Sequence, residues 1–168
     1  MALTAYQVAN QFIANAARDG ETLTHMKIQK LVYYAHGYYL AIFDEPLIEE
    51  AVEAWQYGPV IRSLYRVLKG YGHAPIRKFV EPRAWRRAAL VSVPFGKEGE
   101  NERAVISKVW EAYKGLSGLQ LSALTHAPQT PWALVRDQKG PIYQGIDNRI
   151  LKDYFKGLLR ISGAEPGG

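Results

Sequence analysis

The sequence predicts a mainly α (α+β) fold, a single-domain helical bundle with a few short strands. Two observations lead to this expectation: apolar residues recur at helical spacing in five stretches, and only short extended segments separate them. The chain has 168 residues, of which 48% are hydrophobic and 22% charged, so it can build one domain with its own core. The helical stretches begin near Thr4, Thr24, Pro59, Asn101 and Asp147.

The first helix has clear signals at both ends. Thr4 and Gln7 have the spacing of a capping box, in which each side chain bonds the backbone amide of the other residue. An apolar stripe follows, and Gly20 is a natural C-terminal stop. A short turn then leads to Thr24, whose hydroxyl we expect to cap the second helix.

The second helix, which ends before Pro46, has two unlike faces. One face carries mainly apolar residues at helical spacing, and we expect it to pack into the core. The opposite face carries Lys30, Tyr33 and Tyr34, and seven of the eleven tyrosines lie within residues 33–71. Because this is more aromatic surface than solvation requires, we expect that face to point outward and to bind a partner.

A short strand and a sharp corner follow. Alternation around Val52 favours a strand that ends near Trp55. Gly58 and Pro59 form the corner, and Pro59 suits the first position of a helix because its missing amide hydrogen costs nothing there. In that helix we expect an apolar face of Val60, Ile61, Leu64, Val67 and Leu68, with Arg62, Arg66 and Lys69 opposite.

The second half of the chain has weaker signals until its last helix. The expected elements are short strands or extended segments at 76–80 and 88–93, a helix opening at Asn101, a short helix at 119–126 and an irregular stretch at 128–132. Asp147 should cap the last helix, which buries Leu151 and Phe155. We expect one domain over residues 1–160 and a flexible C-terminal tail over residues 161–168.

Composition limits the cellular compartment and the kinds of chemical site that we expect. The chain has no cysteine, which excludes a disulfide framework, a thiolate zinc site and a thiol nucleophile. Its N-terminus lacks the basic and apolar regions of a signal peptide, and no stretch approaches 18 apolar residues. We expect a cytoplasmic protein.

Charge is distributed unevenly along the chain. Residues 44–53 hold five carboxylates and no basic residue, whereas residues 62–87 hold eight basic residues and only Glu81 as an acid. Such a basic block can simply solvate a surface. It can also steer an acidic partner, either a protein or a nucleic acid.

Motifs of catalytic chemistry are absent from the sequence. The four histidines have no metal-ligand spacing, and there is neither a phosphate-binding glycine loop nor a nucleophile elbow. We therefore expect no enzyme, no cofactor and no metal. His126 and Trp132 fit an architectural role, in which His126 closes a short helix and Trp132 fills the core behind a proline turn.

Four segments together resemble the Panacea domain, the family of SocA-like antitoxins and phage-associated GepA-type proteins. The segments read LTHMKIQKLVYYAHGYYL, EAWQYGPVIRSLYRVLKGYG, LSALTHAPQTPW and a late DYF. The most specific are the Lys-Leu-x-Tyr-Tyr helix from Lys30 and the Ala-Trp-x-Tyr-Gly-Pro-Val run from Ala54. This resemblance runs from about Thr4 to Phe155 and implies a mostly helical antitoxin that neutralises a toxin encoded beside it.

The leading prediction is an antitoxin that binds its cognate toxin directly, because exposed tyrosine and tryptophan suit a protein interface. The predicted contact residues are Lys30, Tyr33, Tyr34, Trp55, Tyr57, Gly58, Pro59, Arg62 and Arg66. Neutralisation could act by occlusion or by delivery of the toxin to a protease. The alternatives are a nucleic-acid-binding protein that uses the Arg62–Arg87 block and, with less support, an uncharacterised enzyme.

Overall fold

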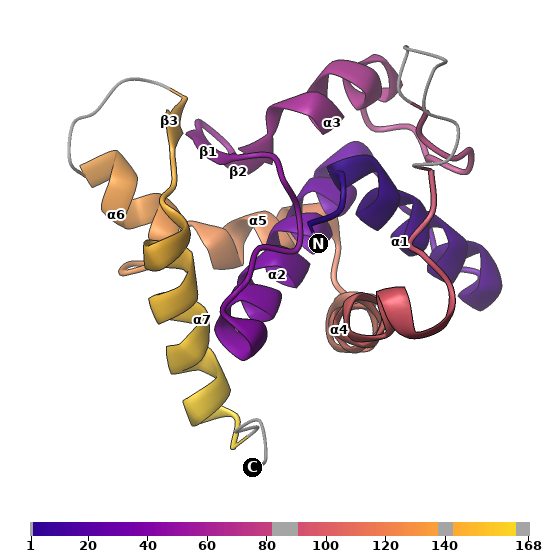
Figure 1. Ribbon diagram of the computed structural model, residues 1–168. Helices are drawn as coiled ribbons and strands as arrows, with labels where there is room; N and C mark the ends of the chain where they lie inside the picture. Colours follow the sequence, from indigo (N-terminus) through magenta and orange to yellow (C-terminus); the bar gives the residue numbers. More distant parts are fainter. Residues whose placement is uncertain (1, 82–90, 138–142, 164–168) are drawn as a thin grey trace.

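The computed structural model describes residues 2–81, 91–137 and 143–163, and it confirms a mainly helical fold with a small sheet (Figure 1). Two short 3₁₀ turns, Lys69–Tyr71 and Gly96–Gly99, supplement the main elements. These elements are α1 (Ala5–Asp19), α2 (His25–Phe43), β1 (Val52–Trp55), β2 (Gly58–Ile61), α3 (Arg62–Leu68), α4 (Glu100–Tyr113), α5 (Gly118–Thr125), α6 (Pro131–Asp137), β3 (Gln144–Gly145) and α7 (Asn148–Ile161).

The predicted helix caps are confirmed. Thr4 and Gln7 form the reciprocal capping box of α1, and Gly20 ends that helix in the left-handed conformation at φ 68°. The Thr24 hydroxyl accepts a hydrogen bond from the Lys27 amide at 3.3 Å, and the Asp147 carboxylate accepts one from the Arg149 amide at 2.7 Å. Each of the three N-terminal caps satisfies an amide that has no partner within its own helix, and the Gly20 amide donates to the Ala16 carbonyl at the other end of α1.

Helix α2 is the centre of the fold. In Figure 1, α1 and α4 lie on one side of α2, α6 and α7 lie on the other, and α3 with the strands lies above it. Helices α1, α4, α5 and α7 all pack directly against α2. A helix that is covered from several directions has no outward face to offer.

The expectation that Lys30, Tyr33 and Tyr34 point outward is therefore wrong. Their exposed fractions are 2%, 1% and 4%. The Tyr33 and Tyr34 rings both contact the Phe155 ring of α7 edge-on, at centroid distances of 5.6 and 5.8 Å, and Tyr34 also stacks on Tyr113 of α4. The tyrosines on this face of α2 are buried like the apolar residues on the other face, because α4 and α7 cover them.

The sheet is antiparallel, with strand order β2-β1-β3. Pro59 does not open a helix as predicted. It lies in β2 opposite Ala54, and α3 begins only at Arg62. Proline is tolerated here because β2 is an edge strand, where one side of the backbone has no strand neighbour. Val60 and Ile61, expected on the face of a helix, are likewise part of β2.

Besides β2, two further elements were not predicted, and two expected strands are not confirmed. Residues 131–137 form α6, which begins within the stretch expected to be irregular at 128–132, and Gln144–Gly145 form β3. Residues 76–80 form no strand and contain a bend at Lys78, and residues 88–90 of the other expected strand lie outside the described residues. The side chain of Asn10 fixes both segments, since its amide binds the carbonyls of Val80 and Val91 at 2.8 Å each. The tail expected at residues 161–168 stays a prediction, because residues 164–168 are not described.

Candidate functional site

The junction between α2 and β2 depends on two adjacent side chains of α2. The Gln29 amide binds the backbone of Ile61 twice: its oxygen accepts from the Ile61 amide at 2.9 Å, and its nitrogen donates to the Ile61 carbonyl at 3.2 Å. The Lys30 ammonium donates to the Pro59 carbonyl at 3.1 Å. Gln29 thus takes the place of a neighbouring strand beside the edge strand β2.

Gly58 allows the chain to turn directly against Lys30. Its φ of 111° is a conformation that residues with a side chain rarely adopt. A Cβ atom at this position would lie 3.0 Å from the Lys30 Nζ and 2.9 Å from the Thr125 Oγ1. The glycine predicted as a corner is thus required both by its backbone conformation and by the close approach of the lysine.

A cleft of about 400 Å³ opens above this junction. Its floor comes from α2, including Gln29 and Lys30, and its walls come from the β1–β2 hairpin, α3 and the chain before β3. None of its lining residues is an aspartate or a glutamate. It therefore combines aromatic walls with a buried cationic group.

Three aromatic side chains gather at the mouth of the cleft. The ring centroid of Trp55 lies 4.7 Å from that of Tyr65 and 4.6 Å from that of Tyr143. The Arg62 guanidinium lies over the Trp55 ring at 5.5 Å and over the Tyr143 ring at 5.7 Å. Glu53 orients the group, since its carboxylate accepts from the Trp55 indole at 2.6 Å and pairs with Arg62 at 2.9 Å. We call Trp55, Tyr65, Tyr143 and Arg62 the aromatic cluster.

Burial perturbs the two basic groups on the floor of the cleft. Burial lowers the pKa of Lys30 to about 8, so the amine still carries its charge at neutral pH. Burial, with a smaller contribution from the Lys30 charge, lowers the pKa of His25 to about 4. Near pH 7 the floor therefore holds one positive charge, on Lys30.

The architectural roles predicted for His126 and Trp132 fit the contacts of these residues. Their rings lie 4.0 Å apart, and the Trp132 indole donates to the Trp55 carbonyl at 2.6 Å. The His126 Nε2 lies 3.3 Å from the Gln56 carbonyl, and the Ser122 hydroxyl donates to the Tyr57 carbonyl at 3.1 Å. Helices α5 and α6 thereby support the hairpin from behind.

The structure brings together most of the residues predicted to bind a partner. Lys30, Trp55, Tyr57 and Arg62 line the cleft or belong to the aromatic cluster, with Gly58 and Pro59 against Lys30. Arg66 lies on the exposed side of α3. Tyr33 and Tyr34 lie beneath α4 and α7 instead. The residues of the site that sequence reasoning missed include His25, Gln29, Tyr65 and Tyr143.

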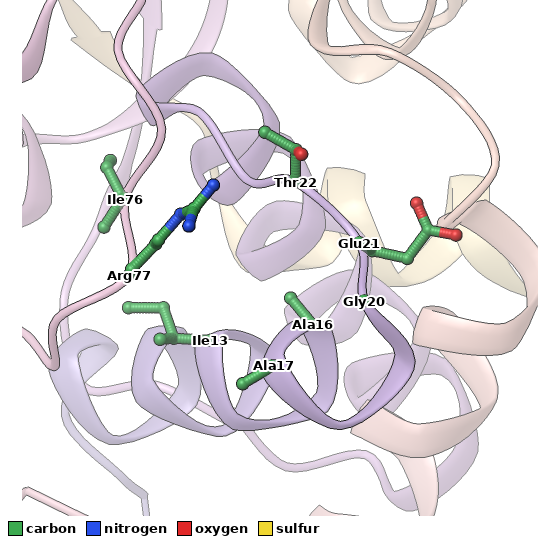
Figure 2. Close-up of a pocket in the computed structure, with 8 residues that line it drawn as sticks. All are labelled: Ile13, Ala16, Ala17, Gly20, Glu21, Thr22, Ile76 and Arg77. Carbon is green, nitrogen blue, oxygen red and sulfur yellow. The ribbon is translucent and has the colours of Figure 1, made fainter.

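A second cleft, of about 320 Å³, lies between α1, the α1–α2 connection and Ile76 (Figure 2). Ile13, Ala16 and Ala17 form its α1 side, and Arg77 extends along the opposite side. Its charged residues, Glu21 and Arg77, are both exposed, so no buried polar group marks it as a binding site.

The acidic segment 44–53 is largely used within the fold. Asp44 pairs with Lys152 at 2.7 Å, Glu50 accepts from the Ala5 amide at the start of α1, and Glu53 supports the aromatic cluster. The described residues contain no group of three or more histidines, cysteines, aspartates or glutamates that could hold a metal ion. None of the described helices is long and apolar enough to cross a bilayer.

Comparison with known proteins places the chain in a family. The family model for the antitoxin SocA-like, Panacea domain matches residues 28–133, which include Lys30, the hairpin and α3. Antitoxin SocA of Caulobacter vibrioides (strain NA1000 / CB15N) is 28% identical over 167 residues, covering 96% of this chain and 86% of that relative. No solved structure matches the chain. Because the family model covers more than half of its residues, the chain belongs to the antitoxin SocA-like, Panacea domain family.

Proposed function

We propose that this protein is a cytoplasmic antitoxin that neutralises a cognate protein toxin by direct binding, through the aromatic cluster and the hairpin turn beside it. The observation that supports this site best is the exposed, pre-arranged set of rings around Trp55. Tyr57 at the turn is 67% exposed, and Tyr65 and Tyr143 are exposed as well. Rings already held by Glu53, Arg62 and each other lose little freedom when a partner binds.

Family membership supports the antitoxin role, and the geometry supports protein binding as its means. Interface hot spots are enriched in tryptophan, tyrosine and arginine, the residue types of the aromatic cluster. Arg66 on the exposed side of α3 and Lys69, exposed in the 3₁₀ turn that follows, add positive charge next to it, which favours an acidic toxin surface.

Rescue of cell growth from the toxin tests this function directly. The protein encoded by the neighbouring gene is expressed from an inducible promoter, with and without this chain, and capture is measured with the purified pair. We expect growth to be restored by the wild type and capture to weaken by about 30-fold or more in Tyr57→Ala, the loss typical of a hot-spot residue.

Phe95→Ala is the matched control, because Phe95 is an 85% exposed aromatic residue outside the aromatic cluster. It should capture the toxin as the wild type does. Equal capture by both variants would place the interface elsewhere, and a toxic neighbour that this chain neither binds nor neutralises would refute the function. A shortened toxin lifetime in cells that contain this chain would indicate delivery to a protease instead of occlusion.

A further inference from the structure

The Lys30 ammonium has hydrogen-bonding capacity that the fold does not use. Its side chain is buried at 2% exposure, and within the described residues its one acceptor is the Pro59 carbonyl. No carboxylate of the described chain lies within 4.0 Å of it. Because an ammonium group has three donors and a buried charge is normally paired, a missing anionic partner is implied.

Lys27, a second buried lysine on α2, provides a comparison because its contacts all lie within the fold. Its ammonium donates to the Lys114 carbonyl at 2.5 Å and lies 5.9 Å from the centre of the Trp110 ring. It lines neither of the two clefts described above. Lys30, by contrast, lines the cleft of about 400 Å³ beneath the aromatic cluster. A partner group can therefore approach Lys30 from outside.

We propose that the cleft receives a carboxylate of the bound protein partner, which pairs with Lys30 while its apolar stem lies against Trp55 and Tyr65. This proposal rests on the proposed function, because it names the group of the toxin that the site recognises. One ammonium matches one carboxylate in charge, and a charge-assisted hydrogen bond to a buried group is stronger than one at the surface.

The donor set favours a carboxylate over a phosphate. Phosphate sites in proteins commonly combine several donors, such as guanidinium forks or the amides at a helix N-terminus. The cleft lining holds one lysine and no arginine, and its two other basic residues are His25 and His73. The low pKa of His25 keeps that ring neutral near pH 7. A single charge among aromatic rings suits a monovalent anion on an apolar side chain.

A titration of the full chain without any toxin tests the site. The probes are N-acetyl-glutamate α-amide with its neutral match N-acetyl-glutamine amide, and N-acetyl-leucine with its amide, which represents a chain-terminal carboxylate. The readout is the indole N–H resonance of Trp55 in two-dimensional NMR, with the Trp110 indole as a remote reference. We expect a saturable Trp55 shift with a carboxylate and none with the matched amide.

Lys30→Met and Lys27→Met form the matched pair of variants. Binding of the carboxylate should weaken about tenfold or more in Lys30→Met, as expected for the loss of a charged hydrogen bond, and stay unchanged in Lys27→Met. If Lys30→Met does not fold, the 15Nζ resonance of Lys30 in the wild type decides, since a bound carboxylate must shift it and the neutral match must not.

Three results would overturn the proposal: equal binding by Lys30→Met, equal binding of the neutral match, or inorganic phosphate binding more tightly than either carboxylate. Preference for N-acetyl-glutamate α-amide would assign the site to an acidic side chain, and preference for N-acetyl-leucine to a chain terminus. Because no toxin is present, a negative titration does not affect the interpretation of the growth-rescue experiment. If growth is not rescued, the titration still shows whether the cleft binds a carboxylate.

Discussion

Replacing Gly37 by alanine should destabilise the protein, although alanine is normally the better residue in a helix. Gly37 lies in α2 at the point where α7 crosses it. An added Cβ atom would lie well under 3.0 Å from three carbons of the Phe155 ring, and real Cβ atoms essentially never come that close. Phe155 is completely buried, so its ring has no free space in which to retreat.

The expected magnitude follows from two opposing effects. Alanine favours a helix over glycine by roughly 0.5–1 kcal/mol, while forcing extra volume into a packed core costs about 1–3 kcal/mol or more. Displacing Phe155 altogether would cost about 3–5 kcal/mol, the loss seen when a buried phenylalanine is truncated. We therefore expect a net loss of roughly 1–3 kcal/mol, or a melting temperature lower by about 3–10 °C in a chain of this size.

Gly157→Ala provides the control, because Gly157 lies in α7 with no atom within 4 Å of an added Cβ. This variant should gain roughly 0.5–1 kcal/mol. Urea unfolding followed by circular dichroism measures both. A gain in stability for Gly37→Ala as well would mean that α7 is not seated on this face, and Tyr33 and Tyr34 would return as an exposed binding surface.

Three further predictions concern charge and pH. The double variant Arg66→Glu with Lys69→Glu should slow toxin capture at low salt and leave dissociation unchanged, because exposed charges act mainly by steering. The nucleic-acid alternative predicts instead that the wild type binds random-sequence DNA with an affinity that falls steeply with salt. The slope of log affinity against log salt concentration would then be steeper by about two units in the wild type than in this variant. The free energy of unfolding should fall as the pH drops from about 6.5 towards 4, because burial lowers the pKa of His36 to about 4 and only the unfolded chain takes up its proton there; this fall should shrink in His36→Gln, measured by urea unfolding. Between about pH 8 and 10 the free energy of unfolding should rise, since folded Lys30 loses its proton with a pKa of about 8 while the unfolded chain keeps it. Burial also lowers the pKa of Lys27, so in Lys30→Met this rise should become smaller, and an identical rise in that variant would contradict the assignment.

The helix ends could be predicted from the sequence because capping is local chemistry. Thr4 with Gln7 and Asp147 with its following turn act over two or three residues, so their spacing alone identifies them. The same reasoning could also have predicted α6, where Thr130 accepts from the Ala133 amide and Pro131 takes the first helical position. We expected only an irregular stretch with a proline turn there.

The environment of α2 could not be predicted from its own residues. Tyrosine is compatible with both a wet interface and a buried stack, and the pattern of one helix does not show whether α4 and α7 will cover it. Gly37 was the available signal, since a glycine inside a helix often marks close packing. The hydrogen bonds between Gln29 and Ile61 and the ring contact between Trp55 and Tyr143 join distant segments, so no local spacing indicates them.

The way the sheet is closed limits how a partner can bind. On the outer side of β2, Pro59 has no amide hydrogen, its carbonyl accepts from Lys30, and both backbone groups of Ile61 are bonded to Gln29. At the other edge, β3 has only two residues, Gln144 and Gly145. A toxin strand added to this sheet would therefore find few free backbone groups.

The proposed recognition of a toxin then depends on side chains. In a strand-addition interface, backbone bonds supply affinity, and truncating one ring costs little. In an interface of rings and one buried charge, Tyr57→Ala and Lys30→Met should each weaken capture on their own, since each removes a different contact. The losses of binding free energy in the two variants should add if the two contacts are independent. They should fall short of the sum if the Tyr57 ring helps to position the carboxylate. A double-mutant cycle on toxin capture distinguishes these cases, and capture that neither variant weakens would point back to backbone pairing.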